Sequence, residues 1–230
     1  MTPLVLLPGM MCDARLFLPQ IEVFAQQRAV HIAPISACDT VSELAREVLA
    51  SAPSRFALAG LSMGGIVAME VLRIARDRVE RIALLDTNPK AETAAVRALR
   101  EPQIEKIKQG ELLTVMRDEM KPNYLVTGPD NSRILDLCMT MAGDLGPEVF
   151  VRQSRALQSR PDQQETLRTA DIPALILCGK EDTLCPVHRH ELMHYLMPHS
   201  QLTIIEHAGH LPTLEQPKAT NAALQRWLEE

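Results

Sequence analysis

The chain has 230 residues, enough for one large α/β domain and too few for two comfortable ones. Apolar residues make up 46% and charged residues 23%, the balance of an ordinary globular protein. The net charge of −5 gives no reason to expect binding to nucleic acid or to an anionic membrane, and no apolar run approaches the length of a membrane span.

The cysteines and the N-terminal residues indicate the cellular compartment in which the protein works. The N-terminal stretch from Met1 to Pro8 has neither a basic region nor a small-residue cleavage site, so we expect no secretion signal. No two cysteines form a C-x-x-C pair, so we expect reduced thiols in a cytoplasmic protein. The five cysteines are Cys12, Cys38, Cys138, Cys178 and Cys185. The histidines show no metal-ligand spacing, so we expect neither a metal nor a cofactor.

The first part of the chain alternates short apolar runs with helical patterns. Strands are predicted at Pro3–Leu7, Ala29–Ile35, Phe56–Leu61 and Arg81–Asp86. Helices are predicted toward the end of Asp13–Gln27, from Thr40 to about Ala52, and over Met63–Arg76. Strands that alternate with helices at short spacing indicate a parallel, doubly wound sheet.

The alternation stops after Asp86. Residues 88–165 contain no convincing strand, only short helical patterns separated by proline and glycine, as at Pro102. Strands resume at Ile172–Cys178 and Gln201–Ile205, and helices are predicted at His188–Met197 and Pro217–Glu229. We therefore predict a core formed by residues 1–87 and 166–230, with a helical lid inserted at 88–165.

One stretch carries a motif with a chemical meaning. The apolar run Phe56–Leu61 is followed by Ser62-Met-Gly64 and then by a helical pattern, so Gly60-Leu-Ser-Met-Gly64 fits the G-x-S-x-G nucleophile elbow. An abrupt turn from strand to helix forces the serine into a strained backbone conformation and exposes its hydroxyl group. Gly60 and Gly64 are small because the helix and a neighbouring strand pass close by.

A serine hydroxyl needs a base to take its proton and a carboxylate to orient that base. Asp182 and His210 each follow a predicted strand, where open parallel sheets place their sites. The order Ser62, Asp182, His210 is the serine–acid–histidine order of one hydrolase fold. Asp86 is the alternative acid and His207 the alternative base; Asp182 and His210 are favoured by their loop contexts.

With these residues in view, the chain resembles the α/β-hydrolase superfamily, in particular its small lidded esterase and enol-lactonase-like branch. The matching segments are Leu6-Leu-Pro-Gly9, Gly60-Leu-Ser-Met-Gly-Gly65, Gly179-Lys-Glu-Asp182, and Gly209-His210 with Glu215-Gln-Pro217. The resemblance implies that Ser62 is the nucleophile, His210 the general base and then acid, and Asp182 the residue that orients it. It also implies an oxyanion hole formed by the backbone N–H groups of Met10 and Met63.

The chain departs from the family pattern in two places. The turn before the oxyanion amide usually begins His-Gly, whereas here it begins Pro8-Gly9. The family sheet usually has an N-terminal hairpin, which this chain lacks before Pro3–Leu7. We therefore expect about six parallel strands in the order 2-1-3-4-5-6, with Ala29–Ile35 as a free edge that a second copy of the chain could cover.

The resemblance implies a serine hydrolase that cleaves a small carboxylic ester or lactone through an acyl-enzyme. Two alternatives stay open: hydrolysis of a carbon–carbon bond or a thioester by the same triad, and a ligand-binding protein that keeps the fold without turnover. One arginine of the predicted lid is a candidate for binding a substrate carboxylate. The lid arginines are Arg97, Arg100, Arg117, Arg133, Arg152, Arg155 and Arg160.

Overall fold

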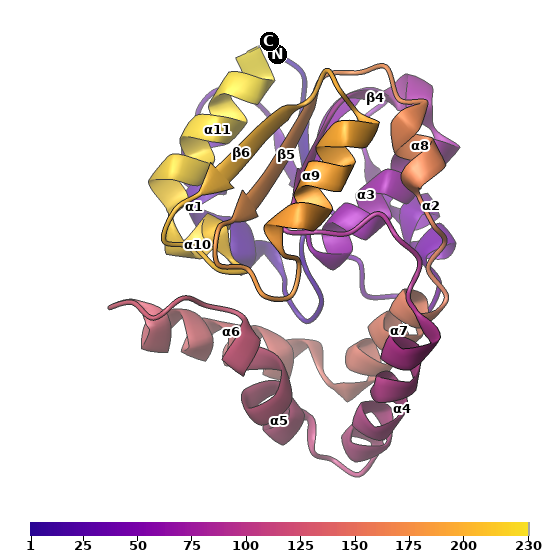
Figure 1. The fold of residues 1–230 in the computed structure, drawn as a ribbon, viewed down its shortest axis with the longest axis vertical. Coiled ribbons are helices and arrows are strands. Elements are labelled where there is room, and N and C mark those ends of the chain that lie inside the picture. The colour runs from indigo at the N-terminus through magenta and orange to yellow at the C-terminus, as the bar shows by residue number, and fades with distance from the viewer. Residues whose placement is uncertain (230) are drawn as a thin grey trace.

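The computed structural model describes residues 1–229 and contains one sheet of six parallel strands (Figure 1). The strands are β1 (Leu4–Leu7), β2 (Val30–Ile32), β3 (Phe56–Leu61), β4 (Val79–Leu85), β5 (Ala174–Gly179) and β6 (Gln201–Ile205). Their order across the sheet is β2-β1-β3-β4-β5-β6, which confirms the predicted fold class and strand order. The central strands are buried on both faces, as expected for a parallel sheet.

Helices cover both faces of the sheet (Figure 1). On one side lie α2 (Val41–Ser51), α3 (Met63–Ile74) and α9 (Val187–Leu196). On the other side lie α1 (Leu18–Phe24) and α11 (Pro217–Glu229), with the short α10 (Pro212–Glu215) beside them. Residues of β1 alternate between two hydrophobic clusters: Val5 belongs to the cluster of the first side and Leu4 to that of the second. Trp227 of α11 is buried in the second cluster.

Proline residues help to set the bounds of one strand and one helix. Strand β2 ends at Ile32 rather than Ile35, because Pro34 has no N–H group to donate to a neighbouring strand. The helix predicted toward the end of Asp13–Gln27 is α1, which has Pro19 in its first turn, and a 3-10 turn, η1 (Ala14–Phe17), precedes it. Both edges of the sheet, β2 and β6, are short.

The segment between β4 and β5 is helical, and it holds no strand in the described chain. Its helices are α4 (Ala94–Lys108), α5 (Leu112–Val115), η3 (Met116–Met120), η4 (Lys121–Asn123), α6 (Asn131–Leu145), α7 (Pro147–Gln158) and α8 (Gln164–Arg168). A short 3-10 turn, η2 (Arg76–Arg78), precedes β4. Helices α4 to α7 lie beyond the carboxyl ends of the strands (Figure 1). This arrangement leaves the strand ends facing the helical segment.

Pro102 does not end a helix, contrary to the sequence pattern. It lies inside α4, which continues to Lys108. A proline within a helix removes one backbone hydrogen bond, but Ile104 and Ile107 beyond it are buried, and their burial favours continuation of the helix. Within residues 1–229, no helix combines the length and the apolar character needed to cross a bilayer.

Candidate active site

Ser62 occupies the turn between β3 and α3. Its backbone has φ 55° and ψ −116°, a conformation that residues other than glycine rarely adopt, as the motif predicted. The turn is tight: a Cβ atom on Gly60 would lie 2.3 Å from the carbonyl oxygen of Gly64, and one on Gly64 would lie 2.0 Å from that of Leu7. Glycine is therefore needed at both positions flanking Ser62.

The loop after β4 supports this turn from the side. Thr87 donates its hydroxyl proton to the carbonyl oxygen of Ser62 at 2.7 Å. The backbone N–H of Thr87 donates in turn to Nε2 of the buried His190 at 3.1 Å. Burial lowers the pKa of His190 to about 4, so this ring is neutral at pH 7 and its Nε2 accepts a hydrogen bond. The elbow thus rests on a short chain of polar contacts that reaches α9.

His210 lies in the loop between β6 and α10, with its ring buried near Ser62. Its Nε2 is 2.9 Å from Oγ of Ser62. The backbone N–H of His210 donates to the carbonyl oxygen of Tyr124 at 2.7 Å, and the two rings are 6.0 Å apart. The carboxylate of Glu215 accepts hydrogen bonds from the N–H groups of Gly209 and Leu211, on either side of His210. The histidine is therefore held by its own loop and by the helical segment.

Asp182 follows β5 and completes the set. Its Oδ2 is 2.8 Å from Nδ1 of His210, and its Oδ1 accepts hydrogen bonds from the N–H groups of Leu184 and Cys185. Burial acts to raise the pKa of Asp182, but the hydrogen bonds from His210 and the loop outweigh it and keep the pKa below its usual value. The carboxyl group is thus ionised at neutral pH and oriented toward the histidine.

Asp86, the alternative acid, takes a different position. It is fully buried, and its Oδ1 accepts a hydrogen bond from the N–H of Gly179 at 2.9 Å. Burial, reinforced by the negative charge of Asp182, raises the pKa of Asp86 well above its usual value. Nδ1 of His210 is bonded to Asp182 rather than to Asp86. His207, the alternative base, is exposed and has φ 57°.

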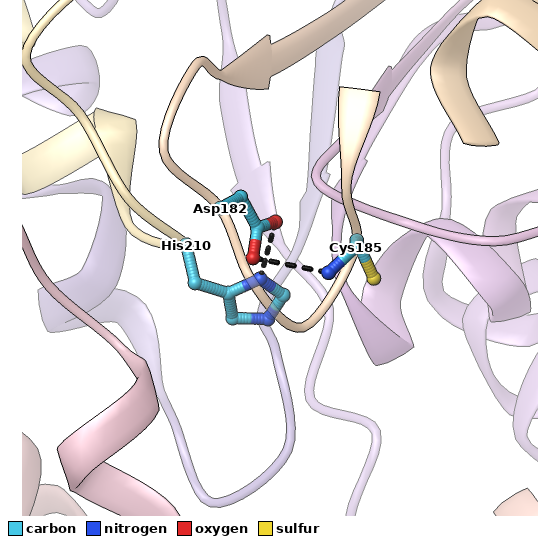
Figure 2. Close-up of side chains that lie close together, drawn as sticks. All are labelled: Asp182, Cys185 and His210. Atoms are coloured by element: carbon cyan, nitrogen blue, oxygen red, sulfur yellow. Dashed lines mark hydrogen bonds and ion pairs between the residues drawn. The ribbon is translucent and has the colours of Figure 1, made fainter. Parts of the chain in front are cut away.

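Asp182, Cys185 and His210 lie close enough together to raise the question of a metal (Figure 2). Both carboxylate oxygens of Asp182 already accept hydrogen bonds. Burial raises the pKa of the Cys185 thiol to about 12, so it is a neutral thiol beside the ionised Asp182. The donor set therefore fits an oriented histidine better than a metal centre.

The turn after β1 carries Met10. It is closed by a hydrogen bond from the N–H of Cys12 to the carbonyl oxygen of Gly9, and Met11 at its third position has φ 54°. Such a turn normally has glycine there, so Met11 is strained. The N–H of Met11 donates to Oε1 of the buried Gln153 at 2.8 Å. Gln153, from α7, thus holds this turn in place. The turn begins with Pro8, where the family pattern usually has a histidine.

The four residues Met10, Ser62, Met63 and His210 line one cavity of about 680 Å³. Met63 is the first residue of α3, and the first N–H groups of a helix have no acceptor within the helix. The amide of Met63 therefore has no acceptor within α3, and Met10 lines the same space. Apolar side chains make up much of the rest of the wall: Ile66, Val96, Met120, Leu157, Leu184, Leu192 and Leu211.

Residues 4–223 match the model of the alpha/beta hydrolase family. The chain belongs to this family. Among curated proteins, it is 25% identical to a pimeloyl-[acyl-carrier protein] methyl ester esterase of Aliivibrio salmonicida, over 98% of this chain and 92% of the relative. It is 23% identical to an esterase of the same name from Nitrosomonas europaea, over 79% and 75% of the two chains.

Solved structures agree with this membership. A thermophilic esterase from Thermogutta terrifontis with malate bound superposes with a TM-score of 0.91 at 25% identity, over 100% of this chain and 90% of that one. An enol-lactonase from Burkholderia xenovorans has the same fold, with a TM-score of 0.90 at 18% identity over 100% and 92%. The family predicted from the sequence is thus confirmed, and the names of its relatives agree with the predicted class of ester hydrolases.

The α/β-hydrolase contains supporting residues that the sequence reasoning did not find. Gln153 is 142 residues from Met11 in the chain, and no local motif marks it. Thr87 and His190 also belong to no recognised pattern, although Thr87 follows a predicted strand end, where side chains near a site are expected. Thr87 also explains why residue 65 is glycine, since a Cβ atom on Gly65 would lie 2.7 Å from the side chain of Thr87.

Proposed function

We propose that this α/β-hydrolase cleaves a small carboxylic ester or lactone with Ser62 as nucleophile, His210 as base and then acid, and Asp182 as orienting carboxylate. The observation that carries the proposal is the line of contacts from Ser62 Oγ to His210 Nε2 at 2.9 Å and from His210 Nδ1 to Asp182 Oδ2 at 2.8 Å. Such a line serves proton transfer to and from a serine.

The proposed reaction has two halves. Ser62 Oγ attacks the carbonyl carbon while its proton passes to His210, and the tetrahedral oxyanion accepts hydrogen bonds from the amides of Met10 and Met63. The C–O bond of the ester breaks, and His210 gives its proton to the departing alcohol; in a lactone this hydroxyl stays attached to the acyl chain. Water, deprotonated by His210, then attacks the acyl-enzyme and releases the acid, and Ser62 recovers its proton.

Methyl esters are the first substrates to try, because the curated relatives are named methyl ester esterases. The partner of the enzyme is then a small molecule that fits the cavity. We also keep a cytoplasmic location as a proposal, which the five free cysteines support. Association of two copies through the edge strand β2 is a further proposal, and a monodisperse monomer in light scattering at high concentration would contradict it.

The test is labelling with a fluorophosphonate, read by intact mass and peptide mapping, on the wild type and on Ser62→Ala. A single adduct on Ser62 that is absent from the variant, together with hydrolysis of a methyl ester by the wild type alone, supports the proposal. Labelling without ester hydrolysis would favour a carbon–carbon or thioester substrate. Absence of labelling, when a control serine hydrolase is labelled, would favour a ligand-binding protein.

A further inference from the structure

The cavity beside Ser62 carries an excess of positive charge. Its lining includes four cationic side chains: Lys90, Arg100, Arg160 and Arg189. Among the described residues that line it, Glu92 is the one carboxylate. A cavity with a mostly apolar wall strengthens electrostatic interactions, so an excess of cations there attracts anionic ligands.

Glu92 pairs more closely with Arg100 than with Arg160. Its two oxygens form a bidentate pair with Arg100, at 2.8 and 2.7 Å, and its side chain is 1% exposed. Arg160 lies farther away, with its Nη1 3.4 Å from the same carboxylate. One buried carboxylate thus serves two guanidinium groups, and the closer one takes both of its oxygens.

Arg160 has a side chain that is largely shielded from solvent. Its side chain is 10% exposed, and its Nε donates to the carbonyl oxygen of Lys90 at 3.0 Å. Burial lowers the pKa of Arg160 from its usual value; Glu92 opposes this effect, whereas the positive charges of Arg100 and Arg189 add to it. A guanidinium has five N–H donors, so Arg160 retains donors for another acceptor.

Arg189 and Lys90 have no carboxylate partner within residues 1–229. Arg189, near the start of α9, donates from Nη1 to the carbonyl oxygen of Leu184 at 2.8 Å and contacts Cys185 Sγ. Lys90 lies in the loop after β4, and its side chain is exposed. These two residues and Arg160, called the cationic wall below, come from three separate segments that meet at one cavity.

We propose that the cationic wall binds a free carboxylate of the substrate, so that the enzyme prefers esters of dicarboxylic acids in which one acid group is esterified and the other is ionised. The inference rests on the proposed ester hydrolysis at Ser62 and specifies its substrate class. The carboxylate accepts hydrogen bonds from Arg160 and Arg189, while the apolar wall contacts the aliphatic chain and the ester lies at Ser62.

The first measurement compares monomethyl esters of succinate, glutarate, adipate and pimelate with methyl esters of the same length that end in an uncharged carboxamide. At the best length, we expect kcat/KM to be at least roughly 10-fold higher for the carboxylate, as for hydrogen bonds to charged groups. Arg160→Gln and Arg189→Gln should each lower kcat/KM for the carboxylate much more than for the carboxamide, so that the ratio of the two falls toward one. Arg133→Gln is the control, because Arg133 is exposed on α6 and does not line the cavity.

A second measurement does not depend on turnover. Ser62→Ala, titrated with the monomethyl esters in a calorimeter, should bind the carboxylate more tightly than the carboxamide, and Arg189→Gln in that background should remove the difference. Equal binding of the two ligands, or equal kcat/KM in the wild type, would overturn the carboxylate subsite while leaving ester hydrolysis intact. Selective binding to Ser62→Ala without any hydrolysis by the wild type would support the subsite and contradict the proposed function.

Discussion

Oγ of Ser62 and Nε2 of His210 lie 2.9 Å apart although 148 residues separate them in the chain. The serine is at the end of β3 and the histidine follows β6, at the far edge of the sheet. The loop of His210 therefore has to reach across the carboxyl ends of two strands. Hydrogen bonds from this loop to Glu215 and to the carbonyl oxygen of Tyr124 hold it in that position.

Replacing each of the two buried aspartates by asparagine distinguishes their roles. In Asp182→Asn, the amide cannot serve both His210 Nδ1 and the loop N–H groups as the carboxylate does, so the histidine loses its orientation. We expect kcat to fall by roughly 10³- to 10⁴-fold without loss of the fold. In Asp86→Asn, the side-chain oxygen still accepts from Gly179, so we expect less than about a 10-fold loss.

Steady-state kinetics and circular dichroism on both variants provide the measurement. A larger loss for Asp86→Asn than for Asp182→Asn would reverse the assignment of the acid and restore the alternative that the sequence left open.

Gln153 offers a test of how the oxyanion turn is held. Gln153→Leu keeps the size of the side chain but removes the acceptor for Met11 N–H and the donor to the carbonyl oxygen of Ile35. The strained turn should then relax and move the amide of Met10. We expect kcat to fall by about 10-fold with little change in KM, and unfolding free energy to fall by about 1–3 kcal/mol.

Gln158→Leu on the same helix is the matched control, since its side chain bonds only to exposed partners on α4 and to Arg155. A kcat for Gln153→Leu equal to that of this control would show that the turn keeps its shape without the glutamine.

Much of the fold was predictable because its determinants are local. Apolar runs of four to seven residues are typical of doubly buried strands, and their alternation with helices leads to a parallel sheet in a strand order that the structure confirms. Ser62, Asp182 and His210 were found because each stands just beyond a strand end in a short recognisable motif. The structure brings these three together, and it keeps His207 outside the site.

The remaining features depend on contacts between distant segments, which no single stretch of sequence records. The sequence offered seven lid arginines as candidates for binding a substrate carboxylate. It could not show that Arg160 lines the cavity, or that Glu92 pairs more closely with Arg100 than with Arg160. Arg189 was not among the seven, because it lies on α9 outside the predicted lid. Gln153 was missed because only the packing of α7 against the turn after β1 gives it a role.

Protonation of Asp182 should not limit hydrolysis near neutral pH. The pKa of Asp182 is below its usual value, because the hydrogen bonds from His210 and from the loop outweigh the effect of burial. Asp182 therefore stays ionised throughout the neutral range. We expect kcat/KM, measured with a neutral methyl ester, to show no step between about pH 6 and 8 that belongs to Asp182. A step in this range that is absent from Asp182→Asn would contradict the ionised state of Asp182.

Glu70 in α3 should control the acid stability of the fold. Its side chain is 0% exposed, and it pairs with Arg73 at 2.8 Å, accepts from Gln163 at 2.7 Å and accepts from Ser42. Burial acts to raise its pKa, but these partners outweigh burial and lower the pKa from 4.5 to about 2. The folded state therefore gains stability from ionised Glu70 at pH values above about 4.5, and loses it as the pH falls toward 2.

This gain in the free energy of unfolding is about 3 kcal/mol at neutral pH. Urea unfolding of the wild type and of Glu70→Gln between pH 7 and pH 3 measures it. The wild type should lose stability more steeply below about pH 5, since the variant has no proton to take up at this position. Glu165→Gln removes only an exposed pair with Arg168 and should follow the wild type. Parallel curves for wild type and Glu70→Gln would mean that folding does not shift the pKa of Glu70, and that the contacts with its partners do not favour its charged form.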